Sequence, residues 1–480
     1  MMWCPPPFHN PRLKVQEQVC WHETHLSENI HHSKDFQGGG VKLSTNEQSN
    51  ESFLERRFRL KEHHTDPKTE VLAGVTTFMT MAYILAVNPL ILSGAGMDQE
   101  AVFTATAVAS ILATVVMAFY ANYPFALAPG MGLNAFFVFG IALRYSWQMA
   151  LAAVFIEGII FILLTLFNVR EAIVKAIPLN LKHAVSVGIG LFIAMIGFKN
   201  AEVVVPYEAT IITLGDLTAA APLTALIGLI ITGVLLAKKV KGALLLGILI
   251  TTAIGIPMGL TDLPSRLVSA PPSLAPVFLQ FDFSNLFTMD MLIILFTLLF
   301  VDMFDTLGTL VGVASKADML DENGNLPKAK QALFADAVGT TAGACLGTST
   351  VTTYVESAAG VAEGGRTGLT ALSAAGMFAI ALFFSPVFIM IPGAATAPAL
   401  VLVGLFMMSP IRKIDLDDYT EAIPAFLTII MMPLTFSIAD GIVFGMVSYT
   451  LLKVITGKIK DVSVIMIVLS ILFIIKFAIG

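Results

Sequence analysis

The sequence predicts an all-α polytopic membrane protein with about fourteen membrane-spanning segments. Three observations predict this class. Hydrophobic residues make up 56% of the 480 residues and charged residues only 13%, whereas a soluble domain carries roughly 25% charged residues. Apolar stretches of about 20 residues, the length that crosses a bilayer as a helix, recur along the chain. Basic residues gather in every second connection between these stretches, as the positive-inside rule requires of cytoplasmic loops.

Polar sequence occupies the N-terminal end. Residues 1–52 are rich in His, Asn, Gln and Gly and lack hydrophobic periodicity, which predicts a disordered tail. The basic, amphipathic segment 53–64 precedes the first apolar stretch, so the N-terminus is expected in the cytoplasm. One membrane domain, 53–480, follows the tail. Its last stretch, 462–479, is apolar but contains Lys476, and forms either a further span or a helix along the membrane surface.

Fourteen apolar segments follow in order, several of them short or interrupted. They are expected at about 71–92, 100–120, 125–143, 147–167, 180–198, 222–238, 240–256, 288–312, 330–347, 350–362, 367–385, 386–408, 420–437 and 439–456. Alternation from a cytoplasmic start places six groups of basic residues on the cytoplasmic side: Arg170/Lys175, Lys238/Lys239/Lys241, Lys316/Lys328/Lys330, Arg366, Arg412/Lys413 and Lys458/Lys460. The agreement of these loops supports the number of segments.

The two halves of the chain show weak internal similarity. GALLLGILITTAIGI (242–256) resembles GIVFGMVSYTLLKVI (441–455), and the run at 177–192 resembles that at 391–406. The matches come in the same order, about 200 residues apart. Seven segments per half is an odd number, so the second half enters the membrane from the opposite side. Such inverted repeats are typical of secondary transporters, whose binding site lies at the repeat interface.

The third segment of each half is interrupted. YPFALAPGMGLNAFF (123–137) and LGTSTVTTYVESAAG (346–360) are short and crowded with Gly, Pro, Ser or Thr. Such pairs indicate a binding site, because a break frees backbone groups that are tolerated only at a cavity or a ligand. Asn134 and Glu356 lie just after the two breaks, where a half-helix begins. The alternative interpretation is close packing of ordinary helices through glycine.

Two aspartates lie inside the apolar stretch LLFVDMFDTLGTLVG (298–312). An ionisable residue at mid-membrane is costly and usually faces a bundle interior or a water-filled cavity. Asp302, Asp305 and Thr309 fall on one side of a helix, with Thr306 close to it. The alternative is a carboxylate near a helix end that reaches the headgroups. Asp336, in another apolar segment, either joins this site or accepts hydrogen bonds from neighbouring threonines.

Several other kinds of site are not indicated. Glu157 is expected to be a structural residue between helices. Cys4, Cys20 and Cys345 have no metal-binding or disulfide spacing, and no metal or cofactor is expected. The sequence lacks a phosphate loop, a nucleophile elbow, a His-rich metal cluster and any nucleic-acid footprint, so an enzyme is not expected.

Four motifs together resemble one known family. They are EVLAGVTTFMTMAYILAVNP (70–89), APGMGLNAFF (128–137), FVDMFDTLGTLVGVASKADM (300–319) and TSTVTTYVESAAGVAEGGRTG (348–368). They are similar to the AzgA-like hypoxanthine/guanine permeases, a branch of the nucleobase–ascorbate transporter (nucleobase:cation symporter) superfamily. The resemblance covers about residues 53–480.

The resemblance implies a fold of two inverted seven-segment repeats. Segments 3 and 10 each hold a short strand followed by a half-helix. A core domain is implied at about 65–168 and 288–385, and a gate domain at about 169–257 and 386–457. In the superfamily, one acidic residue in segment 8 and one in segment 10 hold the base, and these resemble Asp305 and Glu356. Thr309 stands where uracil permeases carry a histidine linked to proton coupling. The resemblance also implies Asn134 and Asp336.

The function expected from these residues is import of purine bases by proton symport across the cell membrane. Asp305 and Glu356 would accept ring N–H bonds, with Asn134, Thr309 and Tyr354 completing the substrate site. Asp302 or Asp336 would carry the coupling proton, because burial and like charge both favour the protonated form of a carboxylate. Membrane lipid, and a second copy bound through the gate domain, are the partners expected, and nucleic acid is not one.

Other transport functions are the alternatives. A transporter of uracil or xanthine would use the same architecture, and Na⁺ could replace H⁺. An anion transporter of the same fold would need helix N-termini and cations rather than carboxylates. Broken segments within an inverted repeat favour a carrier with alternating access over a channel.

Overall fold

The computed structural model describes residues 52–167, 178–284, 288–317, 319–321 and 326–479. Among these residues, nine helices are long and apolar enough to cross a membrane, and four shorter apolar helices accompany them. With α12 and the β4–α13 segment, they account for the fourteen expected segments and the C-terminal helix α19. The predicted helical membrane fold is therefore confirmed. The predicted tail and the loop with Arg170 and Lys175 lie outside the described residues.

The described elements of the first half run from the amphipathic start to the seventh segment. They are α1 Phe53–Phe58, α2 Pro67–Met81, α3 Ile84–Ser93, α4 Gln99–Val116, η1 Met117–Ala121, β1 Leu127–Pro129, α5 Met131–Ala135, η2 Phe136–Ala142, α6 Trp147–Leu166, α8 Leu179–Asn200, β2 Val204–Tyr207, β3 Ile211–Leu214, α9 Ala220–Ala237 and α10 Ala243–Gly255.

The second half repeats the pattern and adds one helix. Its elements are α11 Met289–Lys316, α12 Ala329–Leu346, β4 Val351–Thr353, α13 Ser357–Ala362, α14 Gly368–Ala381, η3 Leu382–Phe384, α15 Ser385–Ile389, α16 Gly393–Met407, η4 Ser409–Lys413, α17 Tyr419–Thr435, α18 Ile438–Ile455, η5 Ile459–Asp461 and α19 Val464–Ile479. The twelfth segment begins at Gly393 rather than at 386, because residues 385–389 form the separate helix α15 and Pro392 cannot continue that helix.

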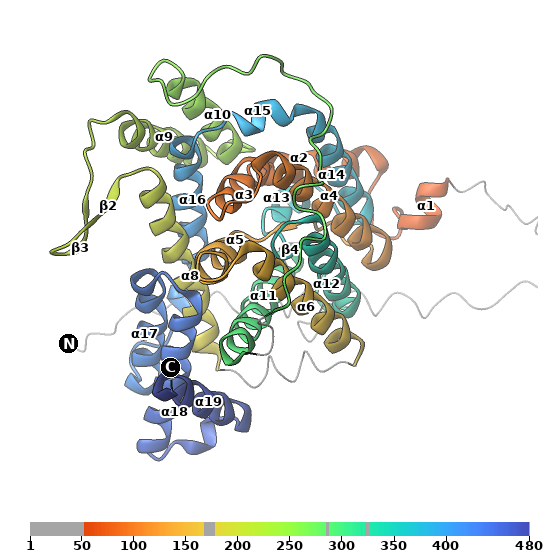
Figure 1. Cartoon of the computed structure of the whole chain (residues 1–480). Coiled ribbons are helices and arrows are strands. Elements are labelled where there is room, and N and C mark those ends of the chain that lie inside the picture. The colour runs from red at the N-terminus through yellow and green to blue at the C-terminus, as the bar shows by residue number, and fades with distance from the viewer. Residues whose placement is uncertain (1–51, 168–177, 285–287, 318, 322–325, 480) are drawn as a thin grey trace, which may run out of the picture. The chain divides into compact units, whose positions relative to one another are not determined.

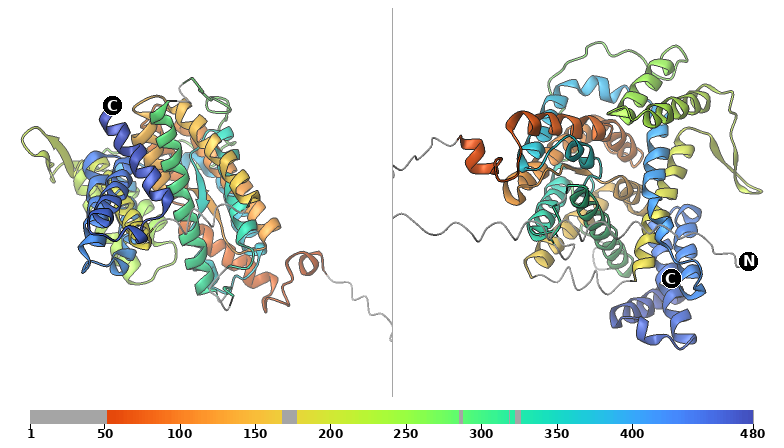
Figure 2. Two further views of the ribbon diagram at one scale, coloured as in Figure 1. Left: turned by 90° about the horizontal axis from the view of Figure 1, so that it is seen from below. Right: turned by 180° about the vertical axis from the view of Figure 1, so that it is seen from behind.

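The helices of this membrane domain form two packed groups (Figures 1 and 2). In the first helix group, α4 packs on α3, α12 and α14, α6 packs on α11 and α12, and α2 packs on α13 and α14. In the second helix group, α8 packs on α16, α17 and α18, and α9 and α10 pack on α16. α19 packs on α18. The groups meet where α8 contacts α5 and α11, where α18 contacts η2 and α11, where α10 contacts α2, and where α16 contacts α3.

The two interrupted segments cross in the middle of the first helix group. β1 and β4 pair antiparallel, with Leu127 opposite Thr353 and Pro129 opposite Val351. The antiparallel pairing follows from the opposite entry of the two halves. Each strand is followed by a short helix, α5 or α13, as the sequence predicts. η2, which continues α5, is a π-helix, a rare conformation that often marks a functional site.

Glu70 joins α2 to the start of α14 and supports a stability prediction. Its buried carboxylate accepts hydrogen bonds from the backbone N–H groups of Arg366 (2.9 Å), Thr367 (3.2 Å) and Thr370 (3.1 Å), and from the Thr370 hydroxyl (2.6 Å). Glu70→Ala leaves these buried donors without acceptors. A hydrogen bond to a charged group contributes about 1.5–3 kcal/mol, so the purified variant in detergent should unfold at a clearly lower temperature than wild type.

The control for this prediction is Glu100→Ala. Glu100 is an exposed acid in the first turn of α4, where loss of the helix-dipole interaction costs about 0.3–1 kcal/mol. Equal melting temperatures for the two variants would contradict the role given to Glu70.

Candidate functional site

The two crossing strands, β1 and β4, lie at the candidate site. Their backbone groups make hydrogen bonds within the protein. Beyond the paired residues, the Gly130 N–H donates to the Thr350 carbonyl (3.0 Å) and the Tyr354 N–H donates to the Ala126 carbonyl (3.0 Å). On the outer edges, the Thr114 hydroxyl accepts from the Leu127 N–H, and the Thr340 hydroxyl donates to the Val351 carbonyl. Membrane-depth backbone that is not helical is tolerated only when satisfied in this way.

Asp305 and Glu356 lie near this crossing. Asp305 approaches the crossing from α11. A Cβ atom added at Gly130 would lie 3.8 Å from Asp305 Oδ2 and 2.7 Å from the Thr352 methyl carbon. The 3.8 Å distance is an ordinary van der Waals contact, whereas the 2.7 Å distance is a clash, so a side chain at position 130 would collide with Thr352 on the partner strand. Glu356 immediately precedes α13 and accepts a hydrogen bond from the Tyr83 hydroxyl at Oε1 (2.7 Å). The two half-buried carboxylates are close enough to interact electrostatically.

Asp302 and Asp336 meet at a different place, around the Thr306 hydroxyl. That oxygen lies 3.2 Å from Asp302 Oδ1, 2.8 Å from Asp336 Oδ1 and 2.7 Å from the Thr352 hydroxyl. Both carboxylates and Thr306 are fully buried. A hydroxyl has one hydrogen and two lone pairs, so it cannot make a full bond to two ionised carboxylates. One added proton completes the network, because a protonated carboxyl group can donate to Thr306.

The remaining predicted residues hold the broken segments together. Asn134 is fully buried and accepts a hydrogen bond from the Ser349 hydroxyl through Oδ1. The Tyr354 hydroxyl donates to the Pro129 carbonyl (2.5 Å). Glu157 accepts from the Thr350 hydroxyl (2.7 Å), which agrees with the structural role expected for it. Thr309 is half-buried, one turn beyond Asp305 on α11.

Sequence reasoning missed Tyr83 and the part played by Thr352. Tyr83 lies between α2 and α3 in an apolar run, where an aromatic residue gives no signal of its own. Its partner, Glu356, is 273 residues away in the chain. Thr352 belongs to the strand β4 and joins the Thr306 network to the strand crossing. A hint for Thr352 was available, because a run of hydroxyl residues precedes Glu356 in the sequence.

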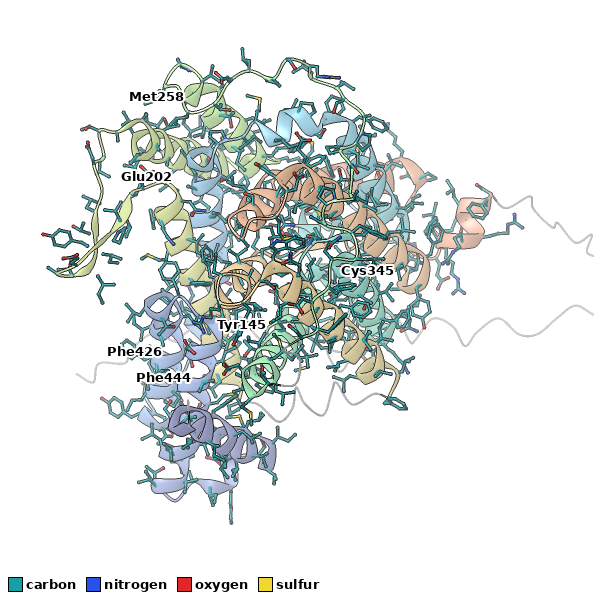
Figure 3. The ribbon with its side chains drawn as sticks, viewed as in Figure 1. Tyr145, Glu202, Met258, Cys345, Phe426 and Phe444 are labelled. Atoms are coloured by element: carbon teal, nitrogen blue, oxygen red, sulfur yellow. The ribbon has the colours of Figure 1, made fainter. Side chains whose placement is uncertain are left out.

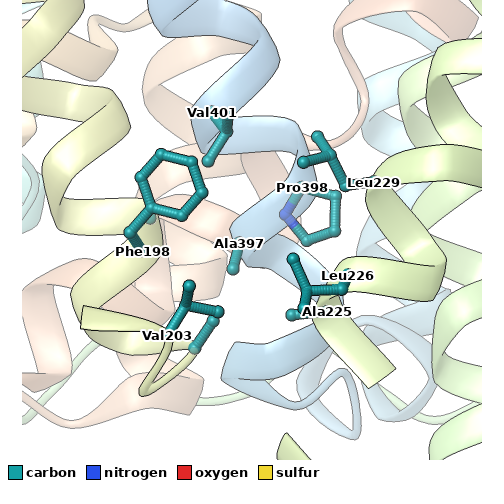
Figure 4. Close-up of a pocket in the computed structure, with 10 residues that line it drawn as sticks. Phe198, Val203, Ala225, Leu226, Leu229, Ala397, Pro398 and Val401 are labelled. Atoms are coloured by element: carbon teal, nitrogen blue, oxygen red, sulfur yellow. The ribbon is translucent and has the colours of Figure 1, made fainter. Parts of the chain in front are cut away.

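Two cavities between helices differ sharply in character. A small apolar pocket lies between α8, α9 and α16 (Figure 4) and has a volume of about 10 Å³, room for about one water molecule. It contains none of the acids described above. A larger cavity of about 280 Å³ lies between η2, α11 and the start of α18 and has charged walls.

Two ion pairs link the two helix groups. Lys241, in the loop before α10, pairs with Glu363 after α13 at 2.7 Å. Arg144, after η2, lies 3.9 Å from Asp440 in the first turn of α18. Both pairs are partly exposed, and such pairs contribute about 0–1 kcal/mol each. They therefore oppose relative movement of the groups only weakly.

Comparisons with known proteins agree on the class of the protein. A family model described as Permease family matches residues 68–444. The adenine permease AdeP of Escherichia coli is 43% identical over 90% of this chain and 97% of its own length. The guanine/hypoxanthine permease PbuG of Bacillus subtilis is 44% identical over 88% of this chain and 98% of its own length. The transmembrane domain of the cyanobacterial bicarbonate transporter BicA has the same fold, with a TM-score of 0.59 and 18% identity, covering 79% of this chain and 97% of that one.

Proposed function

The chain belongs to this Permease family, among the nucleobase–ascorbate transporters, and from that membership we propose that it imports purine bases across the cell membrane by proton symport. It is a multi-pass membrane protein and a transporter rather than an enzyme. The proposed substrates are hypoxanthine, guanine and adenine, the bases named for the two relatives. The N-terminus is proposed to be cytoplasmic, in agreement with the basic loops.

The observation that carries this proposal is the pair of half-buried carboxylates at the strand crossing. Asp305 lies against Gly130, and Glu356 is held by Tyr83. A purine base is flat and presents N–H donors and acceptor nitrogens around its edge. Each carboxylate can accept an N–H bond, and hydrogen bonds to ionised groups are about twice as strong as neutral ones. The N–H donors of a neutral base bound between Asp305 and Glu356 can therefore both find an acceptor.

The same residues argue against an anion as substrate. BicA is a bicarbonate transporter with this fold, and helix N-termini such as those after β1 and β4 can bind anions. Here, however, Asp305 and Glu356 stand at those positions. Two carboxylates repel an anion and attract a donor-rich neutral molecule. Uracil and xanthine remain the alternative substrates, because they also present N–H donors.

Proton coupling is proposed for Asp302 and Asp336. The geometry around Thr306 favours one shared proton over none. Thr352 connects this network to the strand that precedes Glu356. Binding of a base beside Glu356 can therefore change the hydrogen bonding at Thr306 through β4 alone. This short connection supplies a physical route between substrate and proton.

Alternating access is proposed to occur by movement of the first helix group, as the core domain, against the second, as the gate domain. Weak ion pairs link the groups at Lys241–Glu363 and Arg144–Asp440. We also expect a dimer through the second helix group. Figure 3 labels Phe426 of α17 and Phe444 of α18, which are 61% and 37% exposed and offer an apolar face to lipid or to a second copy.

Uptake measurements test the proposal. Cells that lack purine uptake and express this chain should accumulate radiolabelled hypoxanthine, and unlabelled guanine or adenine should compete. A protonophore should abolish accumulation if a proton gradient drives it. Uptake that persists with the protonophore but requires Na⁺ would contradict proton symport. No uptake of any purine by a chain present at the membrane would contradict the substrate class.

Tyr83→Phe tests the arrangement of Glu356. The variant removes only the hydroxyl that donates a hydrogen bond to Glu356 Oε1. Without this bond, the orientation of the Glu356 carboxylate is no longer fixed. Loss of a hydrogen bond to a charged group costs about 1.5–3 kcal/mol, and we expect the KM for hypoxanthine uptake to rise about tenfold or more. Tyr120→Phe is the matched control, because that ring is 54% exposed. An unchanged KM for Tyr83→Phe would show that Glu356 needs no such support.

A further inference from the structure

The cavity of about 280 Å³ lies between the two helix groups, away from the strand crossing. Its walls come from η2, from the loop before α6, from the first turns of α11 and from the start of α18. Figure 3 labels Tyr145, which lies between α11 and the α17–α18 helices. Pockets for small molecules span roughly 300–1,000 Å³, so this cavity suits one ligand of the size of a single base.

The walls of the cavity lead toward Asp305 and Glu356. η2 continues α5, and α5 begins beside Gly130, where the Asp305 carboxylate lies. Phe136, which lines the cavity, is six residues beyond Gly130, or about 9 Å along a helix. On the opposite wall, α11 runs from Ile294 to Asp305, about 16 Å. Two elements, α5–η2 and α11, therefore connect the region of Asp305 and Gly130 to the walls of the cavity.

The polar groups of the cavity carry both signs of charge. Asp290 accepts a hydrogen bond from the Tyr145 hydroxyl at 3.1 Å. Arg144 lies 3.9 Å from Asp440, too far for a direct hydrogen bond. A molecule lying beside this pair could accept a hydrogen bond from the guanidinium and donate one to the carboxylate. The walls carry two carboxylates, Asp290 and Asp440, and one cation, Arg144, which disfavours binding of an anion. The charged walls also disfavour an apolar molecule.

We propose that this cavity is a second binding site for neutral purine bases, occupied before or after the Asp305–Glu356 site. The edge of a purine carries N–H donors for Asp440 and acceptors for Arg144. Tyr145, which is 39% exposed, supplies an aromatic ring beside them. In the proposed topology the cavity faces the outside, so it collects bases ahead of the carboxylate pair. The assignment rests on the proposed purine transport.

Equilibrium binding of radiolabelled hypoxanthine to the purified full chain in lipid nanodiscs tests the assignment. Wild type should bind more than one equivalent at saturation. The double variant Asp305→Asn/Glu356→Gln should keep about one equivalent of weaker binding. Adding Arg144→Gln and Asp440→Asn to that double variant should remove the remainder. The matched control adds Arg266→Gln and Asp262→Asn instead, which make the same charge changes in the exposed loop before α11.

The outcomes separate the two proposals. Wild type that binds no purine would contradict the proposed function itself. Wild type that binds one equivalent, all of it lost in the double variant, would overturn the second site alone. Residual binding that survives Arg144→Gln and Asp440→Asn would also overturn it. In cells, Arg144→Gln/Asp440→Asn alone should raise the uptake KM roughly tenfold and leave the maximal rate within twofold.

Discussion

Uptake of hypoxanthine by Asp305→Asn or Glu356→Gln is expected to fall by roughly tenfold to a hundredfold, and by the double variant to background. Each substitution removes a charged hydrogen-bond acceptor that contributes about 1.5–3 kcal/mol to binding. A loss of about 1.4 kcal/mol weakens binding tenfold. The amide introduced also presents N–H groups toward the N–H groups of the base. In Glu356→Gln the local fold should survive, because the Tyr83 hydroxyl can still donate to the amide oxygen that replaces the carboxylate.

Radiolabelled uptake at equal surface abundance measures this effect. Asp262→Asn and Glu208→Gln are the matched controls, because they make the same chemical changes on exposed loops. Both should transport as wild type does. Wild-type uptake by the double variant would mean that the base binds elsewhere, and the carboxylate mechanism would have to be abandoned.

Asp336→Asn is expected to uncouple transport from the proton gradient. The amide cannot lose a proton, so the network around Thr306 stays in its protonated-like form. Exchange of base across the membrane should continue, while accumulation against a gradient should disappear. With one proton per base, an inward gradient of one pH unit can support about tenfold accumulation. For this variant the accumulation ratio should fall to about one.

Proteoliposomes allow both activities to be measured on the same protein. Counterflow of labelled hypoxanthine reports exchange, and uptake after an imposed pH step reports coupling. Asp302→Asn should behave like Asp336→Asn, because both carboxylates share the Thr306 hydroxyl. Asp262→Asn should keep both activities. Retained accumulation in both Asp302→Asn and Asp336→Asn would move the coupling proton to another group.

The order and limits of the membrane segments could be predicted because the bilayer imposes them. A span needs about 20 apolar residues, and an excess of basic residues indicates a loop on the cytoplasmic side of the membrane. The boundary at 386–408 was less accurate, since Pro392 separates two helices inside one continuous apolar run. The interrupted segments were visible because Gly, Pro and Thr concentrate there. The pairing of β1 with β4 and its register were not predicted and come from the structure.

The acids of the candidate site stood out in the sequence because an ionisable residue in an apolar segment is costly. The side chains that each acid contacts could not be predicted. Asp302 and Asp305 are three residues apart on α11, and the sequence placed them on one face. In the structure Asp302 turns with Thr306 toward α12, whereas Asp305 lies against Gly130. Contacts such as Tyr83–Glu356 depend on how distant segments pack, which periodicity does not encode.

The pairing of β1 with β4 has a consequence for biogenesis. Pro129 and Tyr354, which the crossing joins, are 225 residues apart. Until the ribosome has delivered the second strand, the peptide groups of the first have no partner strand, and lipid offers none. The nascent N-terminal half must therefore wait beside the translocon or a chaperone. Chains truncated before β4 should be recognised by membrane quality control and degraded.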